Sequence, residues 1–170
     1  TVIAYVVDPA DLSVIHQAQV GTRTPDLTDF SGGGYFVLDE RDRIVFPAAG
    51  GVITVLDTAD GIALAEQIQV GDTLTEGEKV TSVLPDWQDR YWYVGSKGTV
   101  GVVAAKGGIP RAVNLSGESI ENSFAVTEDG IFVVTGAAAY RLSAQPAEAP
   151  SVDWRTPYDV GTRQKPGQTS

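Results

Sequence analysis

The segment Gly34-Tyr35-Phe36-Val37-Leu38-Asp39-Glu40-Arg41-Asp42-Arg43-Ile44-Val45-Phe46 places two short apolar runs on either side of a polar turn. The same alternation of apolar run and turn continues to Val70, with further turns at Gly50-Gly51 and from Asp57 to Gly61. Short runs rich in β-branched residues and bounded by Gly and Asp are typical of antiparallel strands joined by tight turns. Residues 32–70 therefore predict a module of four β-strands.

This four-strand plan recurs twice downstream. Residues 80–115 and residues 123–155 each supply four further apolar runs separated by turns, and the modules begin at intervals in the forties. A period of this length with four strands per repeat, and without the helical periodicity of about 3.6 residues, is typical of β-propeller blades. A β-sandwich fits less well, because its strands do not repeat in groups of four. We therefore expect an all-β chain built from propeller blades.

The two ends of the chain supply incomplete modules. Residues 1–20 contain two strands, and the match of Val6-Val7-Asp8 to Val55-Leu56-Asp57 identifies them as the outer half of a blade. Residues 156–170 predict only a connecting loop to a missing blade. We therefore expect residues 1–170 to form a single partial β-propeller domain of about three and a half four-stranded blades, half of a seven-bladed ring.

An open ring would leave strand edges and apolar sheet faces bare at its two broken ends, and such surfaces promote association. The opening strand carries Val2, Ile3, Tyr5, Val6 and Val7, and burial of an aliphatic side chain is worth about 1.5–3 kcal/mol. We therefore expect a complementary chain or a second copy to close the propeller, through an interface larger than about 1,600 Å². A precursor cleaved into two fragments that stay together would supply the complementary chain, and an artificial truncation is a further alternative.

Composition limits the class of protein. The 170 residues are 42% hydrophobic and contain no apolar run near the roughly 20 residues required to span a membrane. With 22 acidic against 12 basic residues, the net charge of -10 disfavours nucleic acid or an anionic membrane surface as a partner. Cysteine is absent, which excludes disulfides and thiolate sites, and the single histidine, His16, excludes a multi-histidine metal site. Methionine is absent even at position 1, so we expect a processed, cleaved or excerpted chain and a secreted or periplasmic location.

The turn that follows the third strand of the first complete module carries a family resemblance. Val55-Leu56-Asp57-Thr58-Ala59-Asp60-Gly61 resembles the turn between the two outer strands of blades in the PQQ-like and YVTN-type β-propeller superfamily, and Val6 to Asp11 is a weaker copy. The equivalent segments 104–107 and 142–145 depart from this pattern. The resemblance implies a propeller fold. It does not imply a quinone cofactor, because the aromatic floor and metal-binding acids of the quinoprotein dehydrogenases have no counterpart in this sequence.

In a propeller, the loops that lead into the first strand of each blade converge at one mouth of the central channel. Their polar residues therefore meet although they lie far apart in the sequence. The mixed acids, amides and bases of these loops suit a small polar ligand, and the basic group near the carboxyl end suits a carboxylate or phosphate. The residues predicted to bind such a ligand are Asp29, Glu78, Lys79, Glu121, Asn122, Arg163, Lys165 and Gln168. The alternative for each of them is an ordinary solvated loop residue.

Two of these residues also predict a cation site. Glu121-Asn122-Ser123-Phe124-Ala125-Val126 with Asp129-Gly130 resembles a segment of the calcium-dependent gluconolactonase and strictosidine-synthase-like propellers, in which the Asn reaches the channel metal. The resemblance implies calcium ligation by Asn122, and Glu121 is a further candidate ligand because calcium binds carboxylate and amide oxygens. Ser123 stands where that family has Gly, and an Asn that satisfies loop backbone groups is the structural alternative.

Two functions fit these observations. The first is a β-propeller scaffold that binds a small polar ligand or a protein partner at the channel mouth, because no catalytic set with recognisable spacing is present and this fold often serves as a scaffold. The second is a propeller hydrolase or lactonase that uses a channel-bound divalent cation. Its remaining ligands would lie on blades outside this chain, and acidic clustering at the channel mouth with a bound metal would favour it.

Overall fold

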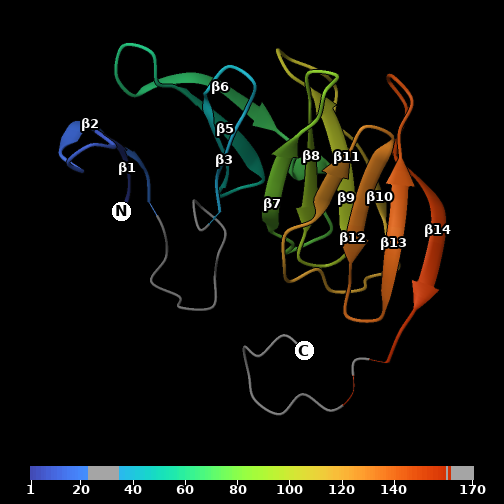
Figure 1. Cartoon of the computed structure of the whole chain (residues 1–170). Helices are drawn as coiled ribbons and strands as arrows, with labels where there is room; N and C mark the ends of the chain where they lie inside the picture. Colours follow the sequence, from blue (N-terminus) through green and yellow to red (C-terminus); the bar gives the residue numbers. More distant parts are fainter. Residues whose placement is uncertain (23–34, 160, 162–170) are drawn as a thin grey trace.

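The computed structural model describes residues 1–22, 35–159 and 161 of the chain. Within these residues, the strands form one two-stranded and three four-stranded antiparallel sheets (Figure 1). The described residues form no helix beyond the 3₁₀ turn η1 (Gly71–Thr73), and this part of the chain therefore holds no helix able to cross a membrane. The prediction of an all-β chain with repeated four-stranded sheets is confirmed.

The strands follow one another in chain order within every sheet, as expected for hairpins joined by tight turns. The two-stranded sheet, called here the half sheet, contains β1 (Val2–Val7) and β2 (Val14–Gly21). The first four-stranded sheet contains β3 (Val37–Leu38), β4 (Ile44–Ala48), β5 (Val52–Asp57) and β6 (Ala63–Gln69). The second contains β7 (Val80–Pro85), β8 (Arg90–Gly95), β9 (Thr99–Ala104) and β10 (Arg111–Asn114). The third contains β11 (Ala125–Thr127), β12 (Gly130–Val134), β13 (Ala138–Ser143) and β14 (Ser151–Pro157).

Neighbouring four-stranded sheets pack against each other through two apolar clusters. Because side chains alternate along a strand, Tyr91 and Tyr93 of β8 join the cluster with the first sheet, whereas Trp92 and Val94 join the cluster with the third. The cluster between the first and second sheets includes Val45, Ile53, Val55 and Ile68 of the first sheet. The cluster between the second and third sheets includes Ile131, Val133, Tyr140 and Leu142 of the third sheet. The second sheet is therefore covered on both faces.

A β-bulge occurs between β1 and β2, between β5 and β6, and between β13 and β14. The register shifts within three equivalent residue pairs: Val6/Val7 in the half sheet, Val55/Leu56 in the first sheet and Arg141/Leu142 in the third. A bulge bends a strand and increases its twist at a defined position. Its recurrence aligns β1 with β5 and β13, in agreement with the sequence match between residues 6–8 and 55–57.

A buried ion pair closes the first hairpin turn of two sheets. In the second sheet, Arg90 Nε lies 2.7 Å from Asp86 Oδ2, and the two side chains are 15% and 5% exposed. In the first sheet, Arg43 Nη2 lies 2.6 Å from Asp39 Oδ2, with the side chains 11% and 4% exposed. Each aspartate also accepts backbone N–H groups through Oδ1, from the residues two and four positions later. The aspartates thus hold both the turn and its arginine.

Both arginines also hydrogen-bond to the next sheet. Arg43 Nη2 donates to Tyr91 Oη at 2.8 Å, and Tyr91 Oη donates to Asp39 Oδ2 at 3.0 Å. Arg90 Nη1 donates to the carbonyl oxygen of Ala144 at 2.9 Å. Burial raises the pKa of the Asp39 carboxyl, but hydrogen bonds from Arg43, from backbone N–H groups and from Tyr91 outweigh burial and lower the pKa below its ordinary value of 3.8. The charged pairs therefore connect neighbouring sheets as well as closing the turns.

We predict that Asp86→Ala lowers the free energy of unfolding by about 3 kcal/mol, because it leaves the buried guanidinium of Arg90 without its counter-charge. Urea unfolding followed by tryptophan fluorescence measures the change. The matched control is Asp153→Ala, whose partner Arg141 lies 3.6 Å away and whose pair is 32% and 25% exposed. We expect this control to lose at most about 1 kcal/mol. Equal losses in the two variants would contradict the role assigned to the turn pair.

Candidate functional site

The eight residues predicted to bind a ligand fall into two groups. Asp29, Arg163, Lys165 and Gln168 lie outside the described residues, and their role stays a prediction. Glu78 and Lys79 directly precede β7, and Glu121 and Asn122 lie in the loop before β11. All four of these described residues therefore lie in loops that lead into the first strand of a sheet, as the sequence pattern indicates.

Glu78 is only 9% exposed, and its carboxylate is bound by protein groups. Oε1 accepts the backbone N–H groups of Lys97 at 2.8 Å and Thr99 at 3.0 Å. Oε2 accepts the hydroxyl of Thr99 at 2.6 Å and both the N–H and the hydroxyl of Thr75, at 2.9 and 2.8 Å. Glu78 therefore holds the β8–β9 hairpin against the loop that precedes β7.

Glu118 is the counterpart of Glu78 in the next inter-sheet loop. Its Oε2 accepts the Thr135 hydroxyl at 2.5 Å, and its Oε1 accepts Arg155 Nη2 at 2.9 Å. Thr135 lies in the β12–β13 turn, so this carboxylate also holds the following hairpin. The sequence analysis missed Glu118, although the pair Gly117-Glu118 repeats Gly77-Glu78 and could have identified it.

The other described residues of the predicted site, Lys79, Glu121 and Asn122, lie in the loops before β7 and β11. Ser82 Oγ of β7 lies 2.8 Å from Ser123 Oγ, which directly follows Asn122. Lys79 donates its backbone N–H to Ser96 Oγ at 3.3 Å. Within the described residues, no group of three or more His, Asp and Glu side chains is arranged to hold a metal ion. Calcium ligation by Glu121 and Asn122 stays a prediction.

A different candidate site lies at the free edge of the half sheet. In each four-stranded sheet, the third strand is hydrogen-bonded on both sides: β5 between β4 and β6, β9 between β8 and β10, and β13 between β12 and β14. The bulge aligns strand β1 with β5 and β13, yet among the described strands β1 pairs with β2 alone. Its inner edge therefore presents backbone N–H and C=O groups that no described strand engages.

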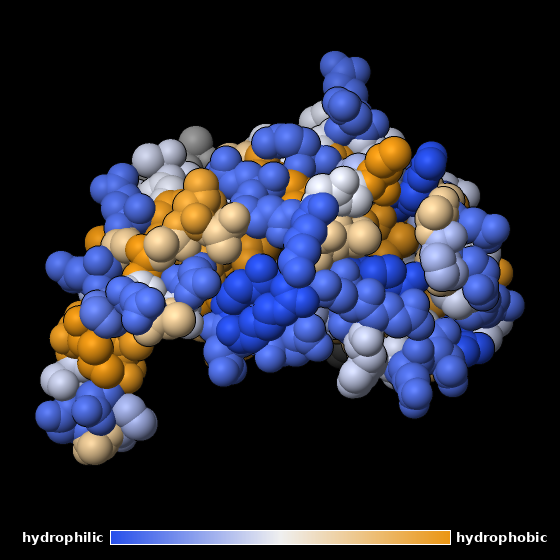
Figure 2. Space-filling model, turned by 90° about the horizontal axis from the view of Figure 1, so that it is seen from above, coloured by the Kyte–Doolittle hydropathy of each residue, from blue (hydrophilic) through white to orange (hydrophobic). Residues whose placement is uncertain are grey.

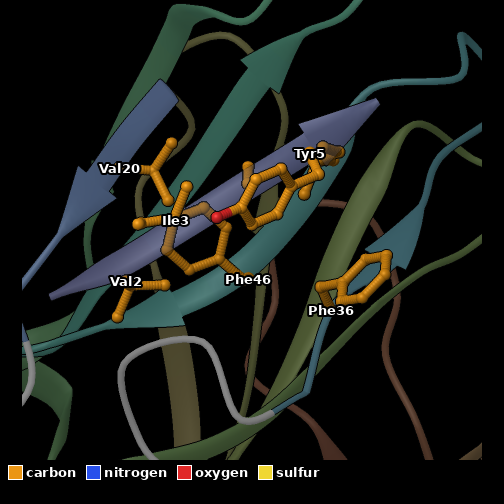
Figure 3. Close-up of a pocket in the computed structure, with 8 residues that line it drawn as sticks. Val2, Ile3, Tyr5, Val20, Phe36 and Phe46 are labelled. Carbon is orange, nitrogen blue, oxygen red and sulfur yellow. The ribbon is translucent and has the colours of Figure 1, made fainter. Parts of the chain in front are cut away.

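An apolar cavity of about 300 Å³ adjoins this edge (Figure 3). The half sheet lines it with Val2, Ile3, Ala4, Tyr5 and Val20, and the chain of the first sheet lines it with Phe36, Ile44 and Phe46. Four consecutive residues of β1 take part, and consecutive residues of a strand point to opposite faces. The cavity therefore touches the edge of β1 rather than one face alone. Phe36 is 67% exposed and Tyr5 is 50% exposed, so aromatic rings are open to solvent here.

Elsewhere the surface mixes charged side chains with apolar ones. Figure 2 shows apolar side chains that gather in patches among the hydrophilic residues. The large apolar residues exposed on the half sheet include Ile3, Tyr5, Val7, Val14 and Ile15. Those exposed on the third sheet are Phe132, Val134, Val152 and Trp154. Both sheets at the ends of the series thus carry apolar side chains that face solvent.

Comparison with known proteins leaves the chain without a family assignment. No protein-family model matches the sequence, and no curated protein is significantly similar to it.

Glu78 predicts a specific dependence of stability on pH. Burial raises the pKa of its carboxyl, but the hydrogen bonds from Thr99 and Thr75 outweigh burial and lower the pKa below its ordinary value of 4.5. A carboxyl whose pKa is lower in the folded state than in the unfolded state stabilises the fold at pH values above its unfolded-state pKa. This stabilisation is lost as the pH falls through the folded-state pKa. Glu78 therefore stabilises the fold at neutral pH and loses this effect below about pH 4.5.

We predict that Glu78→Gln lowers the free energy of unfolding at pH 7 by about 1–3 kcal/mol, because the amide cannot accept all of these hydrogen bonds. The variant should also lose less stability than the unsubstituted protein when the pH is lowered from 7 through 4. Urea unfolding over this pH range measures both effects. The control is Glu76→Gln, an exposed carboxyl in the same loop, which should change the free energy of unfolding at pH 7 by at most about 0.5 kcal/mol. An unaltered profile in Glu78→Gln would refute the assignment.

Proposed function

We propose that this protein is a non-catalytic β-propeller scaffold whose half sheet binds a polypeptide by β-strand addition. In this proposal each four-stranded sheet is a blade, and β1 and β2 are the third and fourth strands of a further blade. The observation that carries the proposal is that no other described strand engages the inner edge of β1, which adjoins an apolar cavity lined by the half sheet and the first sheet. Main-chain hydrogen bonds at such an edge supply affinity, and pockets for alternate side chains supply specificity.

The repeated sheets indicate the chemistry of the bound polypeptide. The strand that pairs with β9 on its inner side is β8, with the sequence Arg90-Tyr91-Trp92-Tyr93-Val94-Gly95. A polypeptide that occupies the same place beside β1 would be extended, rich in β-branched and aromatic residues, and antiparallel to β1. Its alternate side chains would enter the cavity and contact Phe36, Ile44 and Phe46. The preferred partner is therefore an apolar hairpin rather than a charged or flexible segment.

A polypeptide suits this site better than a small polar ligand does. The cavity is lined by aliphatic and aromatic residues, and an open strand edge recognises main chain. At the predicted channel mouth, by contrast, Glu78 already has protein donors on both carboxylate oxygens. The cavity volume of about 300 Å³ is at the small end of the range of about 300–1,000 Å³ for ligand sites, and it can take side chains of a bound strand.

The proposal is tested with a synthetic peptide that has the sequence of residues 80–95, the inner hairpin β7–β8 of the second sheet. We expect this peptide to bind saturably in titration calorimetry, whereas a scrambled peptide of equal composition does not. Phe36→Asp should weaken binding by at least about tenfold, because it places a charge in the cavity that receives the apolar side chains. Phe36 is 67% exposed, so the variant should fold normally.

The matched control is Ile109→Asp, which introduces the same charge at a residue that is 73% exposed and lies outside the cavity. It should bind the peptide as the unsubstituted protein does. Absence of peptide binding at millimolar concentration, or equal loss in both variants, would overturn the proposal.

A further inference from the structure

The contact between the second and third sheets shows how one sheet covers the next. On the second sheet, Trp92, Val94, Val100 and Val102 are between 0% and 5% exposed. On the third sheet, the residues of β13 in the same cluster are Ala138, Tyr140 and Leu142, at 0%, 4% and 0% exposure. Residues of the second strand of one sheet thus pack against alternate residues of the third strand of the following sheet.

The opposite face of the third sheet carries apolar counterparts of Trp92 and Val94, but these counterparts are exposed. Strand pairing sets Trp92 opposite Val102 in the second sheet and Phe132 opposite Arg141 in the third. By this register Phe132 and Val134 occupy the positions of Trp92 and Val94, whereas Arg141 and Ala139 occupy those of Val102 and Val100. They are 38% and 56% exposed, whereas their counterparts are buried. The ring of Trp154 lies 6.0 Å from that of Phe132 and extends the apolar face onto β14.

Strand β1 of the half sheet carries apolar counterparts of the β13 residues in this contact, and these counterparts are exposed as well. The shared bulge aligns Val7 with Leu142, which in turn aligns Tyr5 with Tyr140 and Ile3 with Ala138. Exposure alternates along β1, and these three residues form its more exposed set. Ile3, Tyr5 and Val7 are 46%, 50% and 43% exposed, although their counterparts in the third sheet are almost fully buried.

We propose that the open face of the third sheet docks the half sheet of a second copy, so that copies of this protein associate head to tail. Phe132 and Val134 of one copy and Ile3, Tyr5 and Val7 of the next occupy positions that face each other in the contact between the second and third sheets. The contact is heterologous, since different surfaces of the two copies meet, and successive copies therefore form a closed ring or an open filament. Phe132, Val134 and Trp154 lie outside the cavity proposed to bind a polypeptide, whereas Ile3 and Tyr5 of the half sheet line it, so the two proposals share part of β1.

The test combines two variants that each disable one half of the contact. Phe132→Asp introduces a charge into the open face of the third sheet, and Val7→Asp introduces one into the half sheet without altering the cavity lining. Size-exclusion chromatography with light scattering should show a mass above the 17.9 kDa of one chain for the unsubstituted protein, rising with concentration. Each variant alone should associate at least about tenfold more weakly.

The equimolar mixture distinguishes head-to-tail docking from other association. Each variant keeps the surface that the other lacks, so the mixture should form a dimer and nothing larger. Circular dichroism should show that both variants fold, and Ile109→Asp, the exposed control, should assemble as the unsubstituted protein does.

A single species of 17.9 kDa at all concentrations would overturn the inference, and so would a mixture that stays monomeric. Peptide binding distinguishes its failure from that of the proposed function, because Phe132→Asp should still bind the peptide of residues 80–95, whereas Phe36→Asp should still associate.

Discussion

Burial of both faces of a sheet is the constraint on which this structure depends. Strand β8 shows it most clearly, because Tyr91 and Tyr93 are buried against one neighbour while Trp92 and Val94 are buried against the other. A sheet that is apolar on both faces cannot stand alone in water, so each sheet requires a neighbour on either side. The sheets at the two ends of the series therefore decide how the molecule interacts, since each lacks one of these neighbours among the described residues.

Polar interactions follow the same repeat and link neighbouring sheets. The Asp39–Arg43 and Asp86–Arg90 pairs hold the first hairpin turns and hydrogen-bond to the sheets that follow. Buried ion pairs contribute little net stability, because desolvation offsets their attraction, but they are specific in geometry. Glu78 likewise ties the loop before one sheet to a hairpin of that sheet. Burial of the apolar clusters thus drives the packing of the sheets, and the charged groups favour one alignment of neighbouring sheets.

Much of the fold follows from local sequence. Strands such as Val52–Asp57 and Arg90–Gly95 are short apolar runs between turns, and their pairing requires only hairpins between neighbours. The first strand of the third sheet was predicted less well, because it begins at Ala125 rather than at Ser123. The hydroxyl of Ser123 is engaged by Ser82 of another sheet, which is a tertiary contact that no local pattern contains.

The site was harder to predict because burial and hydrogen bonding of loop residues depend on tertiary structure. Glu78 looks like a solvated loop acid in the sequence, yet its carboxylate is enclosed by donors from a hairpin about twenty residues away. The cavity beside β1 combines residues of β1 with Phe36, Ile44 and Phe46, and the sequence shows the open strand but not the aromatic residues that face it. Repeat alignment identifies which positions are equivalent, whereas only the structure shows which of them are uncovered.

Among the described strands, β1 has a neighbour on one edge only, and the proposed function depends on this open edge. Hydrogen exchange of individual backbone amides, followed by NMR, tests it directly. Alternate amides of β1 should exchange much faster than the corresponding amides of β5 and β9, which are hydrogen-bonded on both sides. Uniform protection of β1 at the level of β5 would contradict it, because the edge would then already be paired in the free protein.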